Sequence, residues 1–160
     1  MEQTLNQEIK AHWQQLRGRT YDLLDHLSDT DLARRLPFPE SQTLGYQFWC
    51  MLGAQESWQP LLTKGVWEGF ACSLNDLPSE AITVALIKNK MQAADQQLFA
   101  ALDSGDLLRI FPERGTALAQ YLRLAEHEGH HHGQLINFIY ALKLPIPASW
   151  ADEWALTRAE

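Results

Sequence analysis

Residues 116–142 read TALAQYLRLAEHEGHHHGQLINFIYAL, and apolar side chains recur along this stretch at spacings of three and four. That repeat predicts one long amphipathic helix. Thr116 is a residue type that caps helix N-termini, and the pattern stops ahead of Pro145 and Pro147.

Three further segments carry helical periodicity, and little of the chain has the alternation of a strand. Four long helices predict an all-α protein built as a four-helix bundle, and the long connection before the third helix suits a crossover. The expected helices cover about residues 4–27, 44–58, 78–103 and 116–142, and Pro60 is expected to kink or end the second. The expected connections are a turn at 32–36, a long segment at 64–78 and an extended pair or loop at 106–115.

The apolar positions of these helices predict the buried core. Ser41 or Thr43 is expected to cap the second helix, and the tail from Trp150 is expected to add a helical turn or two, with Trp150 and Trp154 packed back. The predicted core residues are Leu5, Ile9, Trp13, Phe48, Met51, Leu52, Ile87, Met91, Leu98, Leu124, Leu135 and Phe138.

Length and composition favour a single domain over residues 1–160, because 160 residues with a 46% hydrophobic share suffice for one core. The formal net charge of −7 argues against a nucleic-acid groove and against polybasic membrane docking. Two cysteines are too few for a disulfide framework, and no signal segment is visible at the N-terminus. We therefore expect a cytoplasmic protein with neither a nucleic-acid nor a membrane partner.

His127 and His131 are the candidate metal ligands. They lie at i and i+4 of the last long helix, so both imidazoles project from one face, and that face continues into apolar residues. Two imidazoles at this spacing suit a divalent transition metal, with each nitrogen at about 2.1 Å. The alternative is a histidine pair that only packs in the core.

The neighbours of this pair allow two interpretations each. Glu128 is either an outer partner for an imidazole or a solvated helix charge, whereas His130 and His132 are expected to flank the site or face solvent. Gly129 and Gly133 indicate either the close approach of another backbone or a ligand, or packing alone.

The motif His127-x-x-x-His131-x-Gly133-Gln134 resembles the closing motif of the DinB/YfiT-like family of small metal-binding proteins. The segment Gly45-Tyr46-Gln47-Phe48-Trp49-Cys50, followed by Gln55-Glu56, is similar to the second-helix motif of that family. The resemblance implies a four-helix bundle of up-down-down-up topology, often dimeric, which holds a divalent metal with three histidines. Several relatives are thiol-dependent transferases or isomerases.

The chain departs from this family pattern at the third ligand, which is not histidine. Aligning Gly45-Tyr46 with the usual Gly-Trp of the family places Cys50 at that position, and a shift by one places Met51 there. Cys50 is the better ligand, since a thiolate binds zinc at about 2.3 Å and a Cys-His-His set leaves a fourth position open. Cys50 as a small buried apolar residue is the alternative.

Two functions follow from these residues. The first is a metal-dependent enzyme, by resemblance a thiol-dependent transferase for small electrophiles, with zinc or nickel held by Cys50, His127 and His131. The second is a non-catalytic bundle with a degenerate metal site that acts as a small-molecule binding or interaction module. A small-molecule substrate is expected in the first case, and a homodimer in both, because an apolar-rich chain with six tryptophans leaves an exposed apolar patch.

Overall fold

A computed structural model describes residues 4–158 and is almost entirely helical. This content confirms the all-α prediction. The long helices are α1 (Leu5–Leu24), α2 (Leu44–Lys64), α3 (Val84–Ser104) and α4 (Ala117–Ala141). The short elements are the 3-10 helices η1 (Asp29–Ala33) and η2 (Ser79–Ala81), the helix α5 (Ala148–Trp154) and the antiparallel strands β1 (Ile110–Phe111) and β2 (Gly115–Thr116).

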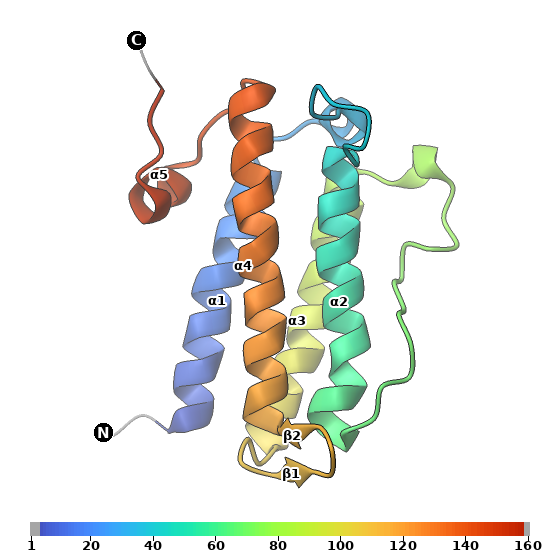
Figure 1. Ribbon diagram of the computed structural model, residues 1–160, viewed down its shortest axis with the longest axis vertical. Coiled ribbons are helices and arrows are strands. Elements are labelled where there is room, and N and C mark those ends of the chain that lie inside the picture. Colours follow the sequence, from blue (N-terminus) through green and yellow to red (C-terminus); the bar gives the residue numbers. More distant parts are fainter. Residues whose placement is uncertain (1–3, 159–160) are drawn as a thin grey trace.

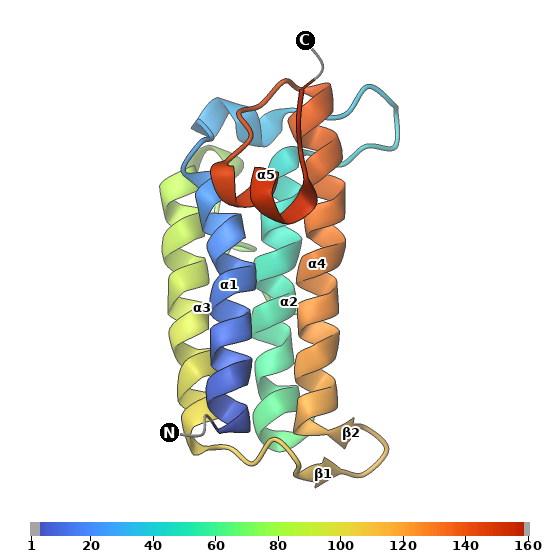
Figure 2. The ribbon, with the colours of Figure 1, turned by 90° about the vertical axis from the view of Figure 1, so that its left-hand side faces the viewer.

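The four long helices lie side by side (Figures 1 and 2). In Figure 1, α1 and α4 run upward along the chain, whereas α2 and α3 run downward. The long connection after α2 therefore returns the chain to the end at which α2 began. In this arrangement α2 packs against both α3 and α4, and α1 packs against the same two helices. No helix within residues 4–158 is long and apolar enough to cross a membrane.

A threonine caps the N-terminus of each long helix. The side chains of Thr4, Thr43, Thr83 and Thr116 each accept a hydrogen bond from a backbone N–H in the first turn. Such a bond satisfies one of the N–H groups that lack a partner inside the helix. Of the two candidate caps for the second helix, Ser41 and Thr43, the structure has Thr43, and the prediction of Thr116 as a cap is confirmed.

Two predicted helix boundaries are wrong. The second helix continues through Pro60 to Lys64 and ends where Gly65 adopts a left-handed conformation with φ of 72°. The third helix begins at Val84 rather than at Pro78, because Thr83 supplies its cap and residues 79–81 form only a 3-10 turn. The extended pair expected within 106–115 is present as β1 and β2.

Most of the predicted core is buried, but Leu5 is not. Leu5 is the first residue of α1 and is 44% exposed, and Ile9 one turn later is partly buried against the second apolar cluster. At the other end of the chain, Trp150 of α5 is fully buried, whereas Trp154 is 39% exposed.

A layer of buried polar side chains separates two apolar clusters. Arg17 on α1, Asp95 on α3 and Glu128 on α4 lie between members of the two clusters along their helices, and Gln55 on α2 directly follows Ala54 of the second cluster. Arg17 Nη2 donates to Gln55 Oε1 at 2.9 Å and to Glu128 Oε2 at 3.2 Å, and Gln55 Nε2 donates to Asp95 Oδ1 at 2.8 Å. This polar layer joins all four helices through one hydrogen-bonded network.

Candidate metal centre

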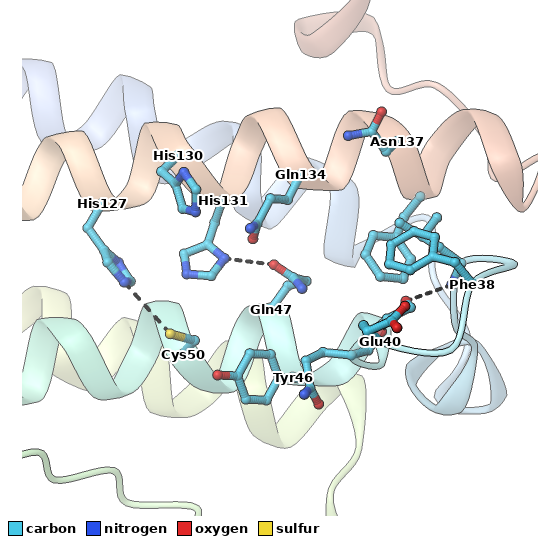
Figure 3. Close-up of a pocket in the computed structure, with 14 residues that line it drawn as sticks. Phe38, Glu40, Tyr46, Gln47, Cys50, His127, His130, His131, Gln134 and Asn137 are labelled. Atoms are coloured by element: carbon cyan, nitrogen blue, oxygen red, sulfur yellow. Dashed lines mark hydrogen bonds between the residues drawn. The ribbon is translucent and has the colours of Figure 1, made fainter.

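The structure brings Cys50 of α2 together with His127 and His131 of α4 (Figure 3). Each residue offers one ligand atom, and these atoms all lie within 4.8 Å of one another. Cys50 Sγ is 3.7 Å from His127 Nε2, and the two imidazole centroids are 4.6 Å apart. The contact between α2 and α4 thus unites three groups that lie up to 81 residues apart in the sequence, since 131 − 50 = 81.

The imidazole of His131 is held by Gln47, one turn before Cys50 on α2. His131 is 4% exposed, and its Nδ1 lies 2.8 Å from Gln47 Oε1. Because an amide oxygen only accepts, Nδ1 carries the hydrogen and donates it, which leaves the lone pair on Nε2 free for a metal. Sequence reasoning missed this role of Gln47, although its spacing of three residues from Cys50 on one helix face was a usable signal.

Burial sets the protonation of the three groups. Burial lowers the pKa of His131 to about 4, with a smaller effect from His127, and it also lowers the pKa of His127. Both imidazoles are therefore neutral at pH 7, which is the form that binds a metal. Burial raises the pKa of the Cys50 thiol, so a metal ion must displace a proton from this sulfur.

These donor atoms fit a tetrahedral zinc-type ion. Bonds of about 2.1 Å to nitrogen and about 2.3 Å to sulfur at a tetrahedral angle place the two ligand atoms about 3.6 Å apart. The separation of Cys50 Sγ and His127 Nε2 is 3.7 Å. One sulfur and two imidazole nitrogens suit zinc or nickel better than a hard oxygen-seeking cation. The set of Cys50, His127 and His131 could hold a metal ion and leave one coordination position for another ligand.

The three candidate ligands line a cavity of about 510 Å³. Figure 3 shows the residues around it, which come from α2, from α4 and from the segment between η1 and α2. Phe38 and Glu40 belong to that segment, whereas Gln134 and Asn137 extend the α4 wall beyond His131. A small molecule in this cavity can reach the cluster from one side.

Two predictions about neighbouring residues are wrong. Glu128 is 1% exposed and is neither a solvated charge nor the partner of a candidate ligand, because it accepts a hydrogen bond from Thr20 at 2.6 Å and pairs with Arg17. His132 is fully buried rather than solvent-facing, with its Nε2 at 2.9 Å from the Thr20 hydroxyl. Both residues lie on the face of α4 that packs against α1. His130 is exposed, as expected.

The glycines of the histidine motif serve no close approach of another part of the described chain. A Cβ added to Gly129 or Gly133 would meet no atom within 4 Å among residues 4–158, apart from those of its own helix backbone and chain neighbours. Met51, the alternative to Cys50, is fully buried in the apolar cluster next to α3. The helix geometry thus places Cys50, and not Met51, beside the two histidines.

Comparison with known proteins places the fold. No protein-family model matches the sequence, and no curated protein matches it. A DinB-like protein from Bacillus cereus ATCC 10987 superposes with a TM-score of 0.70 at 22% identity, over 92% of this chain and 99% of that one. A DinB-like protein from Bacillus subtilis, YjoA, gives a TM-score of 0.64 at 20% identity, over 86% of this chain and 96% of that one. The chain therefore has the fold of DinB-like proteins, as the sequence motifs predicted.

Proposed function

We propose that this protein, which shares its fold with DinB-like proteins, is a metal-dependent enzyme that transfers a thiol to a small electrophile. In this proposal Cys50, His127 and His131 hold a divalent transition metal, zinc or nickel. The observation that carries the proposal is the convergence of one sulfur and two neutral imidazoles beside a cavity of about 510 Å³.

The residues around the cluster have separate tasks in this reaction. Gln47 keeps the Nε2 lone pair of His131 free for the metal, and the exposed aromatic side chains of Phe38 and Tyr46 line the cavity in which the substrate would bind. A bound divalent ion supplies the Lewis acidity that lowers the pKa of a thiol. The thiol sulfur bonds to the electrophilic carbon, the leaving group departs with the electron pair of the broken bond, and the thiol proton is released to water.

The proposal includes the finer architecture that the sequence suggested. An up-down-down-up four-helix bundle over residues 1–160 is supported by the helix directions in Figures 1 and 2. A homodimer is supported by exposed large apolar side chains, among them Trp67 and Phe70 of the connection after α2. Sedimentation at micromolar concentration tests the dimer, because a single species of 18.3 kDa would contradict it.

A second candidate function is a non-catalytic module that binds a small molecule in the same cavity. The observation that favours it is the thiol of Cys50 in the position where the resemblance expects a histidine, since burial keeps this thiol protonated. A protein that never displaces this proton would hold no metal.

Metal content separates the two functions. The protein should be purified without a histidine tag, and its transition metals should be measured by inductively coupled plasma mass spectrometry. A stoichiometric metal that is lost in Cys50→Ala supports the enzyme. An absence of transition metal in the wild-type protein, even after incubation with zinc and nickel, supports the binding module.

A further inference from the structure

The charged side chains in the walls of the cavity are unequal in sign. Among the 14 residues that line it, Glu40 is the one carboxylate, and neither lysine nor arginine is present. The nearest arginines along the chain are engaged elsewhere, because Arg35 donates to the backbone oxygen of Ser41 and Arg34 pairs with Asp31. A ligand with an anionic tail would therefore meet Glu40 without a lysine or arginine in the lining to pair with, and His130 is the one exposed basic side chain among the 14 lining residues.

The segment that carries Glu40 is a built part of the wall. Ser41 is 4% exposed, and its hydroxyl accepts a hydrogen bond from Leu36 N at 2.9 Å and donates one to Gln42 O at 2.8 Å. These bonds fix the turn between η1 and α2, whose residues line the cavity. The backbone that carries Glu40 is therefore fixed, and its exposed carboxylate side chain lines the cavity.

Gln134 adds an acceptor to the same cavity. Its Oε1 is buried and has no donor at full hydrogen-bond geometry within the described part of the chain, residues 4–158, although the Gln134 side chain lies close enough to the His131 imidazole to raise the pKa of that histidine slightly against the lowering by burial. A buried acceptor without a donor is unfavourable, so a ligand that supplies an N–H group gains what the protein lacks. Gln134 lies one turn after His131 on α4, between the candidate ligands and Asn137 (Figure 3).

We propose that the cavity selects thiols whose far end carries a protonated amine, and that Glu40 and Gln134 recognise this amine. The inference rests on the proposed function, since the thiol end reaches the cluster of Cys50, His127 and His131. It adds the chemical class of the tail: a cationic hydrogen-bond donor, and not a carboxylate or a phosphate.

The test measures thiol binding to the full-length protein loaded with Co²⁺, from the change in its visible absorption. The probes are ω-amino alkanethiols of increasing chain length, together with ω-hydroxy and ω-carboxy alkanethiols of the same lengths. Each affinity is compared between wild type and variant, so that differences in thiol pKa cancel. Glu126→Gln is the matched control, because this exposed carboxylate of α4 does not line the cavity.

We expect Glu40→Gln to weaken the aminothiols about two- to five-fold, the range of an exposed ion pair, and to leave the hydroxythiols unchanged. Gln134→Leu should weaken the aminothiols by about tenfold, the loss of a hydrogen bond to a charged group. Asn137→Asp, a surface change at the rim, should strengthen aminothiols relative to hydroxythiols and provides a test that does not depend on the stability of the Gln134 variant.

Two results would overturn the inference in distinguishable ways. If all three thiol classes bind and neither Glu40→Gln nor Asn137→Asp changes the order among them, the selection of a cationic tail is wrong and the proposed function stands. If no thiol of any class changes the Co²⁺ spectrum, the proposed function fails and the inference falls with it.

Discussion

Gln47→Ala should weaken metal binding although Gln47 is not itself a metal ligand. In the wild-type protein Gln47 Oε1 accepts the Nδ1–H of His131 at 2.8 Å, inside a region where both side chains are buried. Removal of the amide leaves this N–H without its acceptor, and the imidazole can then rotate or place its hydrogen on Nε2. Either change removes the lone pair from the position where it meets Cys50 and His127.

The expected loss is about 10- to 100-fold in affinity, the range found when the hydrogen-bond partner of a ligating histidine is removed. This corresponds to about 1.4–2.7 kcal/mol of binding free energy. The free energy of unfolding of the apoprotein should fall by about 1 kcal/mol, the net value of one neutral hydrogen bond. The effect on metal binding therefore exceeds the effect on stability.

Competition with a chromophoric chelator gives the zinc affinity of each variant, and ¹⁵N NMR of the apoprotein gives the tautomer of His131. Gln47→Glu retains an acceptor and should restore most of the affinity, whereas Gln42→Ala alters the same cavity without touching His131 and should have no effect. An affinity of Gln47→Ala within about twofold of wild type, in a folded protein, would refute the argument, as would an Nε2–H tautomer in the wild type.

Other changes test the cluster, the polar layer and the buried thiol. In the same chelator assay, Cys50→Ser should weaken zinc binding strongly and His131→Ala should nearly abolish it. The zinc affinity of the wild-type protein should fall as the pH drops, because protons compete for the thiolate and the imidazoles. Unchanged affinity in Cys50→Ala would show that the cysteine only packs. Arg17→Met should lower the free energy of unfolding, measured in urea, by about 3–5 kcal/mol, because it leaves Glu128 buried without a cation. The double variant with Glu128→Gln should recover part of that loss. Additive losses from the two substitutions would contradict the coupling. Burial raises the pKa of Cys72 to about 11. Because a thiol ionises only as the pH rises toward its pKa, about one molecule in a thousand carries the thiolate at pH 8. Iodoacetamide should therefore label Cys72 slowly in the native state. Labelling at the rate of the urea-unfolded protein would contradict this prediction.

The helices could be predicted because their signals are local. Thr116, the apolar repeat that follows it and the prolines beyond it are consecutive in the sequence, and α4 has the predicted limits within a residue. Pro60 led to the wrong prediction for the end of the second helix. A proline lacks only its own N–H and clashes only with the preceding turn, and α2, which packs against helices on two sides, tolerates both effects. The start of α3 depended on which of two competing caps forms, and Thr83 prevailed over Pro78.

The candidate site was predictable only in part, because its third member is defined by a contact between two helices. The spacing of His127 and His131 follows from one helix alone. The choice between Cys50 and Met51 required the rotation of α2 relative to α4, which neighbouring residues on α2 do not reveal. The spacing of Gln47 from Cys50 placed both residues on one face of α2, but the role of Gln47 was missed because it depends on the contact with His131 across the two helices.

The largest error concerned the faces of α4, and its cause is geometric. Successive residues on a helix differ by about 100°, so a helix packed against one neighbour buries one stripe and exposes the next. The α4 helix packs against both α1 and α2 and therefore buries two adjacent stripes. His131 faces the cavity beside α2, His132 bonds to Thr20 of α1, and His130 remains exposed. Three consecutive histidines thus provide a candidate metal ligand, a hydrogen-bond partner in the polar layer and an exposed side chain that lines the cavity, and composition alone could not have assigned these places.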